Sequence, residues 1–282
     1  MSAATGGSEP RLSGRGLCWF QALTGEGGLL ACGPRTVRVA DAPLGGETAR
    51  FIAVVPDAAN RFPRARGGEV GLDEAWTLAH EVRRAIAEDR QRRPRPLIAV
   101  VDVTSQAYGR SEELLAIHLA GAAAADAYAS ARLEGHPVIA LLVGKAMSGA
   151  FLTHGYQANR ILALDSPEVL IHAMSKESAA RVTRRTVEAL EELGERITPM
   201  AYDVRSFARL GLLHRLIEGV NADAPGAADV ERVRSELSAA VADARATPHD
   251  LSSRLTSQGA AAVRAASLEV RRRLAEEWDA AS

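Results

Sequence analysis

Two runs of apolar residues in the middle of the chain carry the clearest structural pattern. Leu97 to Val103 is apolar except for Asp102, and Pro137 to Val143 is apolar after its proline. Neither run alternates with polar residues, which is typical of parallel strands that helices cover on both faces. A long alanine-rich segment with helical character separates them. The pattern therefore predicts a strand–helix–strand unit in a parallel α/β sheet.

Two loops of this unit are expected at one edge of the sheet. Ser111 can cap the intervening helix, with Glu112 and Glu113 at the positive end of its dipole, and Gly135 can end it. The loops that leave the two strands, residues 104–110 and 144–150, then meet at the carboxyl ends of the strands. Open α/β sheets bind their ligands at this edge.

The second loop, residues 144–150, reads Gly-Lys-Ala-Met-Ser-Gly-Ala and precedes a short predicted helix. Its small residues let a ligand approach the main chain. Free N–H groups at the start of the helix can face a developing negative charge. The alternative is a tight turn that serves only the close packing of helix and strand.

The rest of the pattern predicts a lead-in, a hairpin and several helices. Residues 1–16 are rich in Gly, Ser and Arg and are expected to be disordered. Turn-forming residues at 43–46 separate two β-type runs, 35–41 and 49–55, which predicts a hairpin. The helix expected at 73–92 has an apolar stripe that includes Trp76 and Leu78. Other expected elements are strands at 160–165 and 168–173, and helices up to about residue 158, from 175 past 196, and at 202–210, 230–245 and 260–278.

Composition and charge exclude several classes of function. The hydrophobic fraction of 47% is typical of a globular protein, and 34 Lys and Arg against 35 Asp and Glu leave a formal charge of -1. This balance provides no overall basic field for nucleic acid or an anionic membrane. No apolar run approaches the roughly 20 residues of a membrane span and no signal peptide is recognised, so we expect a cytoplasmic location. Cys18 and Cys32 are expected as a buried hydrophobe and a loop thiol, and the seven histidines show no metal-ligand spacing.

Several separated segments resemble one protein family. Residues 144–151, Gly-Lys-Ala-Met-Ser-Gly-Ala-Phe, resemble the segment Gly-Lys-Ala-Tyr-Gly-Gly-Ala-Tyr of the carboxyltransferase branch of the crotonase superfamily. Residues 40–46, 55–66 and 155–160 look like the gamma subunit of malonate decarboxylase, in the same order and spacing. The resemblance implies a crotonase-like ββα superhelix domain at 17–224. A helical extension is expected at 225–282. The apolar faces of its helices pack on the domain, which is the favoured interpretation, or on a partner.

The resemblance also implies a reaction and its partners. The chain would pair with a homologous beta subunit and act on a malonyl thioester. The malonyl group would be carried on an acyl carrier protein by a phosphopantetheine-type arm, and loss of carbon dioxide would leave an acetyl thioester. No cofactor is expected on this chain. Some relatives pass the carboxyl group to biotin, which would here sit on another subunit because the chain lacks an Ala-Met-Lys-Met type of segment.

In this family the oxyanion turn falls at Gly149 and Ala150, whose backbone N–H groups would stabilise the enolate oxygen. Ser148 stands where the family more usually has glycine, so its hydroxyl either helps to bind the carboxylate or simply fits the turn. Ser148 is not expected to be a nucleophile, because no Gly-x-Ser-x-Gly elbow or partner histidine accompanies it. Met147 is expected beside the turn as a substrate contact.

Two further loops supply candidate substrate contacts. Thr104-Ser105-Gln106 stands where carboxyltransferases carry Thr-Pro-Gly. Gly109 would leave room for the acyl group, and Tyr108 would form a wall or donate a hydrogen bond, unless this is an ordinary connecting loop. Arg61, Arg64 and Arg66 suit the phosphate of a carrier arm, because a guanidinium group matches phosphate oxygens. A solvated loop or a subunit contact is the other interpretation of these arginines.

The proton donor and the degree of self-sufficiency stay open at this point. His154 and Tyr156 follow the oxyanion turn closely and are either proton donors or core residues. The chain could contribute its own oxyanion turn, or serve as a structural subunit that supports the site of the beta subunit. A self-sufficient hydratase or isomerase of the crotonase type would need an acid near the turn, and Glu112 and Glu113 are the nearby candidates.

Overall fold

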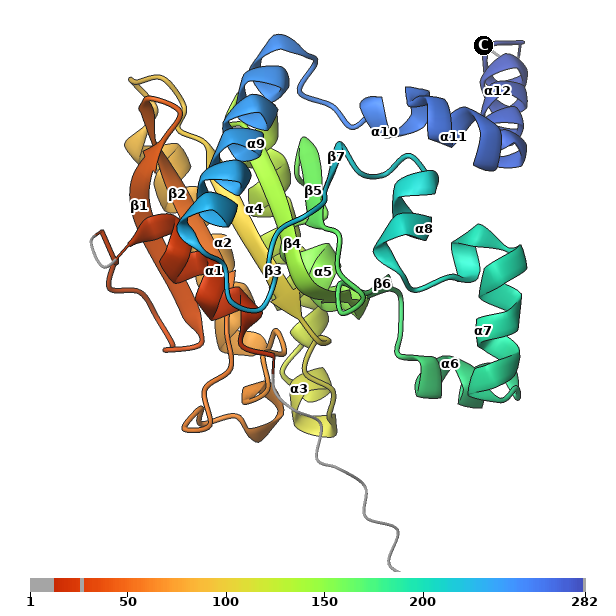
Figure 1. Ribbon diagram of the computed structural model, residues 1–282, viewed down its shortest axis with the longest axis horizontal. Coiled ribbons are helices and arrows are strands. Elements are labelled where there is room, and N and C mark those ends of the chain that lie inside the picture. The colour runs from red at the N-terminus through yellow and green to blue at the C-terminus, as the bar shows by residue number, and fades with distance from the viewer. Residues whose placement is uncertain (1–12, 26–27, 281–282) are drawn as a thin grey trace, which may run out of the picture.

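A seven-stranded sheet forms the centre of the molecule (Figure 1). The computed structural model describes residues 13–25 and 28–280. The strands lie in the order β1-β2-β3-β4-β5-β7, and β6 pairs with the end of β4. Only β1 and β2 are antiparallel, so the predicted hairpin and parallel strand–helix–strand unit are both confirmed. The strands are β1 (Val37–Leu44), β2 (Glu47–Val54), β3 (Leu97–Val103), β4 (Val138–Met147), β5 (Arg160–Leu164), β6 (Ile171–His172) and β7 (Arg215–Ile217).

Helices cover both faces of this sheet. Helices α1 (Arg15–Thr24) and α9 (Ala227–Ala246) lie on one face, and α2 (Leu72–Glu88) and α4 (Ile117–Leu133) lie on the other (Figure 1). Beyond β6 lies a second group, which contains α6 (Lys176–Thr183), α7 (Val187–Arg196) and α8 (Val204–Arg209). The remaining elements are η1 (Pro63–Ala65), α3 (Arg110–Leu114), α5 (Ser148–Thr153), η2 (Thr198–Met200), α10 (Ser253–Thr256), α11 (Gln258–Val263) and α12 (Ala265–Ala280).

One hydrophobic core joins the sheet to the helices on its two faces. Strands β3 and β4 are buried along nearly their whole length, as their unalternating sequences predict. Helix α9 adds Val233, Leu237 and Ala240 to the same core, so this part of the C-terminal region packs on the domain as expected. Helix α12, in contrast, has no buried residue.

The end of β4 differs from the expectation. The predicted strand stops at Val143, whereas β4 runs on to Met147 and takes in half of the predicted loop. The extension is held by β6, because the Ala146 N–H donates to the carbonyl oxygen of Leu170 at 2.8 Å. The helix that follows begins at Ser148 and ends at Thr153, well before residue 158.

Two long predicted helices are each divided by a left-handed residue. Ala116, with φ of 60°, separates α3 from α4, and the first of these begins after Gly109 without a side-chain cap, so Ser111 is not the cap. Arg184, with φ of 54°, ends α6, and the hydroxyl of Thr186 starts α7 by accepting from a backbone N–H. Since neither break contains Gly or Pro, the sequence has no residue there that usually signals the end of a helix.

Several smaller expectations are corrected. Trp76 is 51% exposed and not part of the core stripe of α2. It precedes the buried Leu78 by two residues, which places it about 200° away around the helix. The strand expected at 168–173 is reduced to two residues, the helix at 260–278 is split into α11 and α12, and β7 was not foreseen. Of the lead-in, residues 1–12 lie outside the described residues, and α1 already begins at Arg15. Cys18 and Cys32 are both unpaired and partly buried.

Candidate active site

A bulge between β3 and β4 shapes the strand end that leads into the site. The pairing shifts after Val101, and Asp102 fills the irregularity. One oxygen of Asp102 accepts the Lys145 N–H at 3.0 Å, and the other accepts the Gly16 N–H at 3.1 Å. A Cβ atom on Gly144 would lie 2.1 Å from Asp102 Oδ1, so this position requires glycine for close approach. Asp102 thereby fixes the end of β4 and holds helix α1 against it.

Ser148 has a left-handed backbone at the junction of β4 and α5. Its φ is 57°, a conformation that glycine adopts freely and that other residues adopt at a cost of about 1 kcal/mol. Its hydroxyl donates to the carbonyl oxygen of Ala173 at 2.9 Å and accepts from the hydroxyl of Tyr108 at 3.3 Å. The usual family glycine at this position is thus explained by the backbone.

The facing loop supplies a direct contact to the turn. Gln106 Oε1 accepts the backbone N–H of Gly149 at 2.9 Å. The loop is itself fixed by Val70, whose N–H donates to Ser105 and whose carbonyl oxygen accepts from Ala107. The two loops therefore meet at the carboxyl edge of the sheet, as predicted. Gln106 was not among the expected site residues. It belongs, however, to residues 104–106, the segment that differs from the Thr-Pro-Gly of carboxyltransferases.

A cavity of about 310 Å³ opens beside Gly149. Small side chains of α4, including Gly121, Ala122 and Ala125, form much of its wall, and Gln106 borders it. Gly149 is the one residue of the expected site that lines this cavity within the described residues. The remaining lining residues are Val70, Ala75, Glu113, Ile117, His118, Leu152 and Thr153.

The geometry of the turn suits an oxygen that carries negative charge. Gly149 and Ala150 lie in the first turn of α5, where the helix has no internal acceptors for backbone N–H groups. Gln106 shows that the Gly149 N–H can bind a carbonyl oxygen that comes from the side of the cavity. An oxyanion at the same place would gain more than an amide, because hydrogen bonds to charged acceptors are stronger.

The other expected substrate contacts are not all gathered at this cavity. A Cβ atom on Gly109 would lie 2.7 Å from Arg64 Nε, so Arg64 is a neighbour of the facing loop. Arg66 donates to the carbonyl oxygen of Asn60 at 2.9 Å within its own loop. Met147 is buried, with 6% exposure, and ends β4. None of these residues lines the cavity, and their roles stay predictions.

Of the two candidate proton donors, His154 is enclosed in the core. Its side chain is fully buried and hydrogen-bonds the hydroxyl of Tyr128 at 3.0 Å and the carbonyl oxygen of Val100 at 3.2 Å. Burial lowers the pKa of His154 to about 4, although the bond to Val100 acts in the opposite direction. Tyr156 packs edge-on against Phe151. The geometry favours the core interpretation for His154, which cannot reach the cavity without unpacking.

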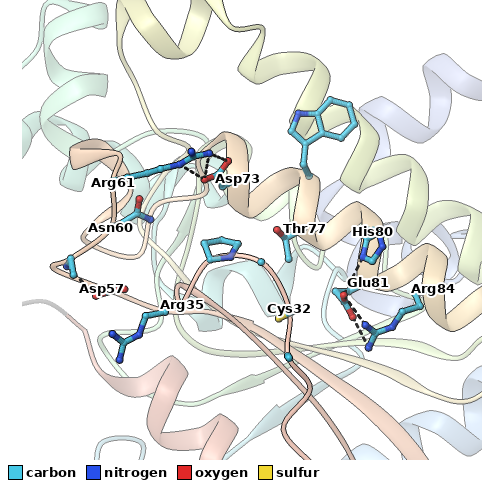
Figure 2. Close-up of a pocket in the computed structure, with 15 residues that line it drawn as sticks. Cys32, Arg35, Asp57, Asn60, Arg61, Asp73, Thr77, His80, Glu81 and Arg84 are labelled. Carbon is cyan, nitrogen blue, oxygen red and sulfur yellow. Dashed lines mark hydrogen bonds and ion pairs between the residues drawn. The ribbon is translucent and has the colours of Figure 1, made fainter.

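A larger cavity, of about 720 Å³, lies between residues 31–35 and helix α2 (Figure 2). Four of its charged side chains form two ion pairs: Arg61 contacts Asp73 at 2.8 Å, and Arg84 contacts Glu81 at 2.9 Å. Of the candidate residues from the sequence, Arg61 lines it, and the ion pair with Asp73 already engages the Arg61 guanidinium group. Its size alone therefore does not make it the reaction site.

The described residues show neither a metal site nor a membrane span. Within residues 13–25 and 28–280, no group of three or more His, Cys, Asp and Glu side chains is placed to hold a metal ion. Across the same residues, every helix is too short or too polar to cross a membrane.

Comparison with known proteins gives consistent relatives. The family model of the malonate decarboxylase gamma subunit matches residues 65–278. The malonyl-S-ACP:biotin-protein carboxyltransferase MADD of Malonomonas rubra is 37% identical over 194 residues, which span 67% of this chain and 66% of that protein.

Solved structures extend this agreement to the fold. One chain of a Pseudomonas malonate decarboxylase heterotetramer in complex with coenzyme A is 55% identical, with a TM-score of 0.89 over 94% of this chain and 99% of that chain. A chain of the Pseudomonas MdcD–MdcE heterodimer is also 55% identical, with a TM-score of 0.86 and the same coverage. Transcarboxylase 12S, at 19% identity and a TM-score of 0.60 over 81% of this chain and 40% of that chain, shares the fold, which confirms the expected crotonase-like class. The chain therefore belongs to the malonate decarboxylase gamma-subunit family.

Proposed function

We propose that this chain, together with a homologous beta subunit, decarboxylates a malonyl thioester carried on an acyl carrier protein. Three relatives support the proposal: the two Pseudomonas assemblies, and the carboxyltransferase MADD, whose name specifies malonyl-S-ACP. The observation that carries it is the hydrogen bond from the Gly149 N–H to the side-chain oxygen of Gln106, beside the 310 Å³ cavity that both residues line.

The reaction requires stabilisation of a single oxygen. The bond between the malonyl carboxylate and the methylene carbon breaks, and its electron pair passes into the thioester to form an enolate. Carbon dioxide leaves, and a proton then adds to the methylene carbon to give the acetyl thioester. The enolate charge collects on the thioester oxygen, where the N–H groups of Gly149 and Ala150 would hold it. Loss of one such donor typically slows an enzyme by about 100- to 1,000-fold.

Binding of the thioester would exchange one acceptor of the Gly149 N–H, the Gln106 side chain, for another, the thioester oxygen. The Gln106 amide oxygen occupies the Gly149 N–H when no thioester is bound. An incoming thioester oxygen would replace it, so the donor is satisfied in both states and no buried N–H is left without an acceptor. Tyr108 would steady Ser148 through the 3.3 Å hydroxyl contact.

The face beside the cavity supports a shared site. Leu115, Leu119 and Leu152 are 61%, 57% and 53% exposed, and Leu152 also lines the cavity. Exposed apolar side chains gathered next to a cavity are typical of a subunit interface. We assign this face to the beta subunit, which would close the cavity and bring the malonyl carboxylate to the turn.

The remaining expected contacts complete the proposal. Side chains of Glu112 and Arg64 fill the space beside Gly109, so they would have to move for Gly109 to leave room for the acyl group next to Tyr108. Met147 would support the turn as the last residue of β4. Arg64 and Arg66, both exposed, would meet the phosphate of the phosphopantetheine-type arm. The cytoplasm remains the proposed location.

Transfer of the carboxyl group to biotin is the second candidate function. It is favoured by the relative MADD, whose name specifies a biotin protein as the acceptor. In that case the biotin would be carried by another subunit. Release of carbon dioxide from the purified beta–gamma heteromer without any biotin protein would support direct decarboxylation. Appearance of the carboxyl group on an added biotin protein, with no carbon dioxide released in its absence, would support transfer.

Replacement of Gly149 by valine tests the catalytic role of the turn. A Cβ atom here would meet Gln106 Oε1 at 3.0 Å and would narrow the place of the thioester oxygen. We expect Gly149→Val to reduce carbon dioxide release from malonyl carrier protein by about 100-fold or more while the heteromer still assembles. Gly14→Val is the matched control, because a Cβ atom on Gly14 meets nothing within 4 Å.

The outcome distinguishes three hypotheses: a shared catalytic site, a structural subunit and a self-sufficient crotonase-type enzyme. Activity of Gly149→Val near that of the wild type would show that the chain only supports the site of the beta subunit. Hydration or isomerisation of an acyl thioester by the isolated chain would favour a self-sufficient crotonase-type enzyme. We expect the isolated chain to be inactive in both assays.

A further inference from the structure

A polar cavity of about 300 Å³ lies at the opposite edge of the sheet from the oxyanion turn. It is formed where β5 begins, between residues 211–214, the end of α9 and helix α10. Two of its lining side chains, Arg160 and Arg254, are only 5% and 7% exposed. The cavity therefore brings two desolvated cations to one wall.

Arg160 is balanced by a carboxylate and by hydroxyl groups. Its Nε donates to Asp243. Its other nitrogens donate to Ser253 Oγ at 3.2 Å and to Thr247 Oγ1 at 2.7 Å. Asp243 is the one carboxylate among the lining residues that the structure describes.

Arg254 has no such balance. In the described part of the chain, no carboxylate oxygen lies within 4.0 Å of its guanidinium group. Its partners are the carbonyl oxygen of Ala158 and the ring of Tyr156, whose centroid is 5.0 Å from the guanidinium carbon. Burial, together with the charges of Arg132 and Arg160, lowers the pKa of Arg254 to about 10, although Tyr156 acts in the opposite direction.

Arg132 adds a third buried cation close to this wall. It is 7% exposed, and it donates to the carbonyl oxygens of Gln157, at 3.1 Å, and of His249. Of these three buried guanidinium groups, Arg160 bonds a carboxylate directly, and Arg132, whose pKa burial lowers, has the exposed Asp250 close enough to raise that pKa in part. A buried charge is costly unless an opposite charge accompanies it, so the cavity lacks an anion.

We infer that this cavity binds a small oxyanion, a phosphate or a carboxylate, with Arg254 as its main ligand. Ser253 already accepts from Arg160, and its hydroxyl proton remains available to the anion. A volume of about 300 Å³ has ample room for either group. The bound anion would connect α10 to the first residue of β5, and so the C-terminal helices to the sheet.

The thermal stability of the full-length protein tests the inference. Sodium phosphate and sodium acetate are added separately to the protein, each against sodium chloride of equal ionic strength. At an anion concentration about ten times the dissociation constant, we expect Tm to rise by about 3 °C. The anion that produces the larger rise identifies the ligand class.

Arg254→Met is expected to abolish the rise, and Arg205→Met is the matched control. Arg205 is an exposed arginine, paired with Asp165 far from the cavity. If Arg254→Met does not fold, Ser253→Ala serves instead and is expected to weaken the anion by about fivefold. An equal Tm rise in the wild type and the cavity variant, or no rise beyond that of chloride, would overturn the inference.

Discussion

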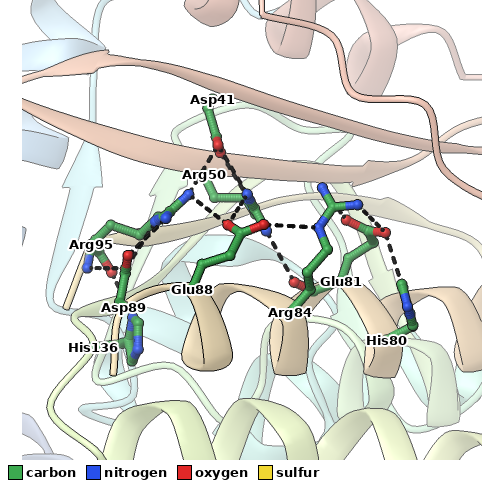
Figure 3. Close-up of polar contacts among 9 residues, drawn as sticks. All are labelled: Asp41, Arg50, His80, Glu81, Arg84, Glu88, Asp89, Arg95 and His136. Carbon is green, nitrogen blue, oxygen red and sulfur yellow. Dashed lines mark hydrogen bonds and ion pairs between the residues drawn. The ribbon is translucent and has the colours of Figure 1, made fainter. Parts of the chain in front are cut away.

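The two ends of the central strands differ in their polar contacts: ion pairs dominate at the amino ends, and hydrogen bonds between neutral groups at the carboxyl ends. At the amino ends, Arg50 is 1% exposed and contacts Asp41 and Glu88, while Arg95 contacts Asp89 (Figure 3). Nearly every charge in this network has an opposite partner within 3.1 Å. At the carboxyl ends, the contacts around the oxyanion turn join amides, hydroxyl groups and backbone N–H groups.

This difference separates stability from function. In a network of paired arginines and carboxylates the opposite charges largely cancel. Removal of one side chain is costly, because its partner then stays buried without an opposite charge. The groups that hydrogen-bond at the turn are neutral, in contrast, so that oriented N–H groups can act on the enolate charge, although Glu113 also lines the cavity. Asp102 is a carboxylate that shapes the carboxyl edge, and two backbone N–H groups and the hydroxyl of Ser13 donate to it.

The largest stability effect is expected in the paired network. Arg50→Met removes the buried arginine that Asp41 and Glu88 share, leaves them Arg95 as their common partner, and should lower the free energy of unfolding by about 3 kcal/mol. Urea unfolding of the purified protein measures it. Arg83→Met, which breaks an exposed pair with Asp126, is the control and should cost less than about 1 kcal/mol. Equal effects of the two variants would remove the distinction between buried and exposed pairs.

Asp102→Asn tests the one carboxylate that shapes the site. The variant amide can still accept from Lys145, but its NH₂ group then faces the Gly16 N–H, donor against donor. We expect a loss of about 2 kcal/mol in unfolding free energy, together with slower carbon dioxide release by the heteromer. Unchanged activity at reduced stability would show that the bulge does not position the turn.

A pH series tests the assignment of His154 to the core. Burial lowers its pKa to about 4, against about 6.5 in an unfolded chain. Because the fold favours the neutral ring, its contribution to stability is complete above pH 6.5 and declines as the pH falls toward 4. His154→Gln should therefore show a shallower loss of unfolding free energy between pH 7 and 4 than the wild type.

The same variant also bears on the proton donor. Carbon dioxide release and acetyl thioester formation should both persist in folded His154→Gln heteromer. Loss of activity by more than about 100-fold without loss of folding would return His154 to the reaction as an acid.

The smallest effect is expected at Ser148. Ser148→Gly relieves the left-handed backbone but removes the hydrogen bond to Ala173, and each is worth about 1 kcal/mol. The unfolding free energy should therefore change by less than about 1 kcal/mol, and activity should be retained. A large loss of activity would give the hydroxyl a direct role in substrate binding.

The sequence predicts the frame of the site better than its contacts. Strand β3 is predicted to the residue, because a buried parallel strand must be apolar on both faces. The meeting of the two loops follows from the parallel arrangement. The bond between Gln106 and Gly149 does not, since it joins side chain and backbone across 43 positions of the chain. The left-handed breaks at Ala116 and Arg184 lack glycine, and no local pattern marks them.

The proposed mechanism places the enolate oxygen at the backbone N–H of Gly149, where it replaces Gln106. A crystal structure of the beta–gamma heteromer with a stable malonyl-thioester analogue tests it most directly. The thioester oxygen is expected at about 2.7–3.1 Å from Gly149 N, with the Gln106 amide displaced. An analogue bound entirely within the beta subunit, with Gln106 still on Gly149, would contradict the mechanism.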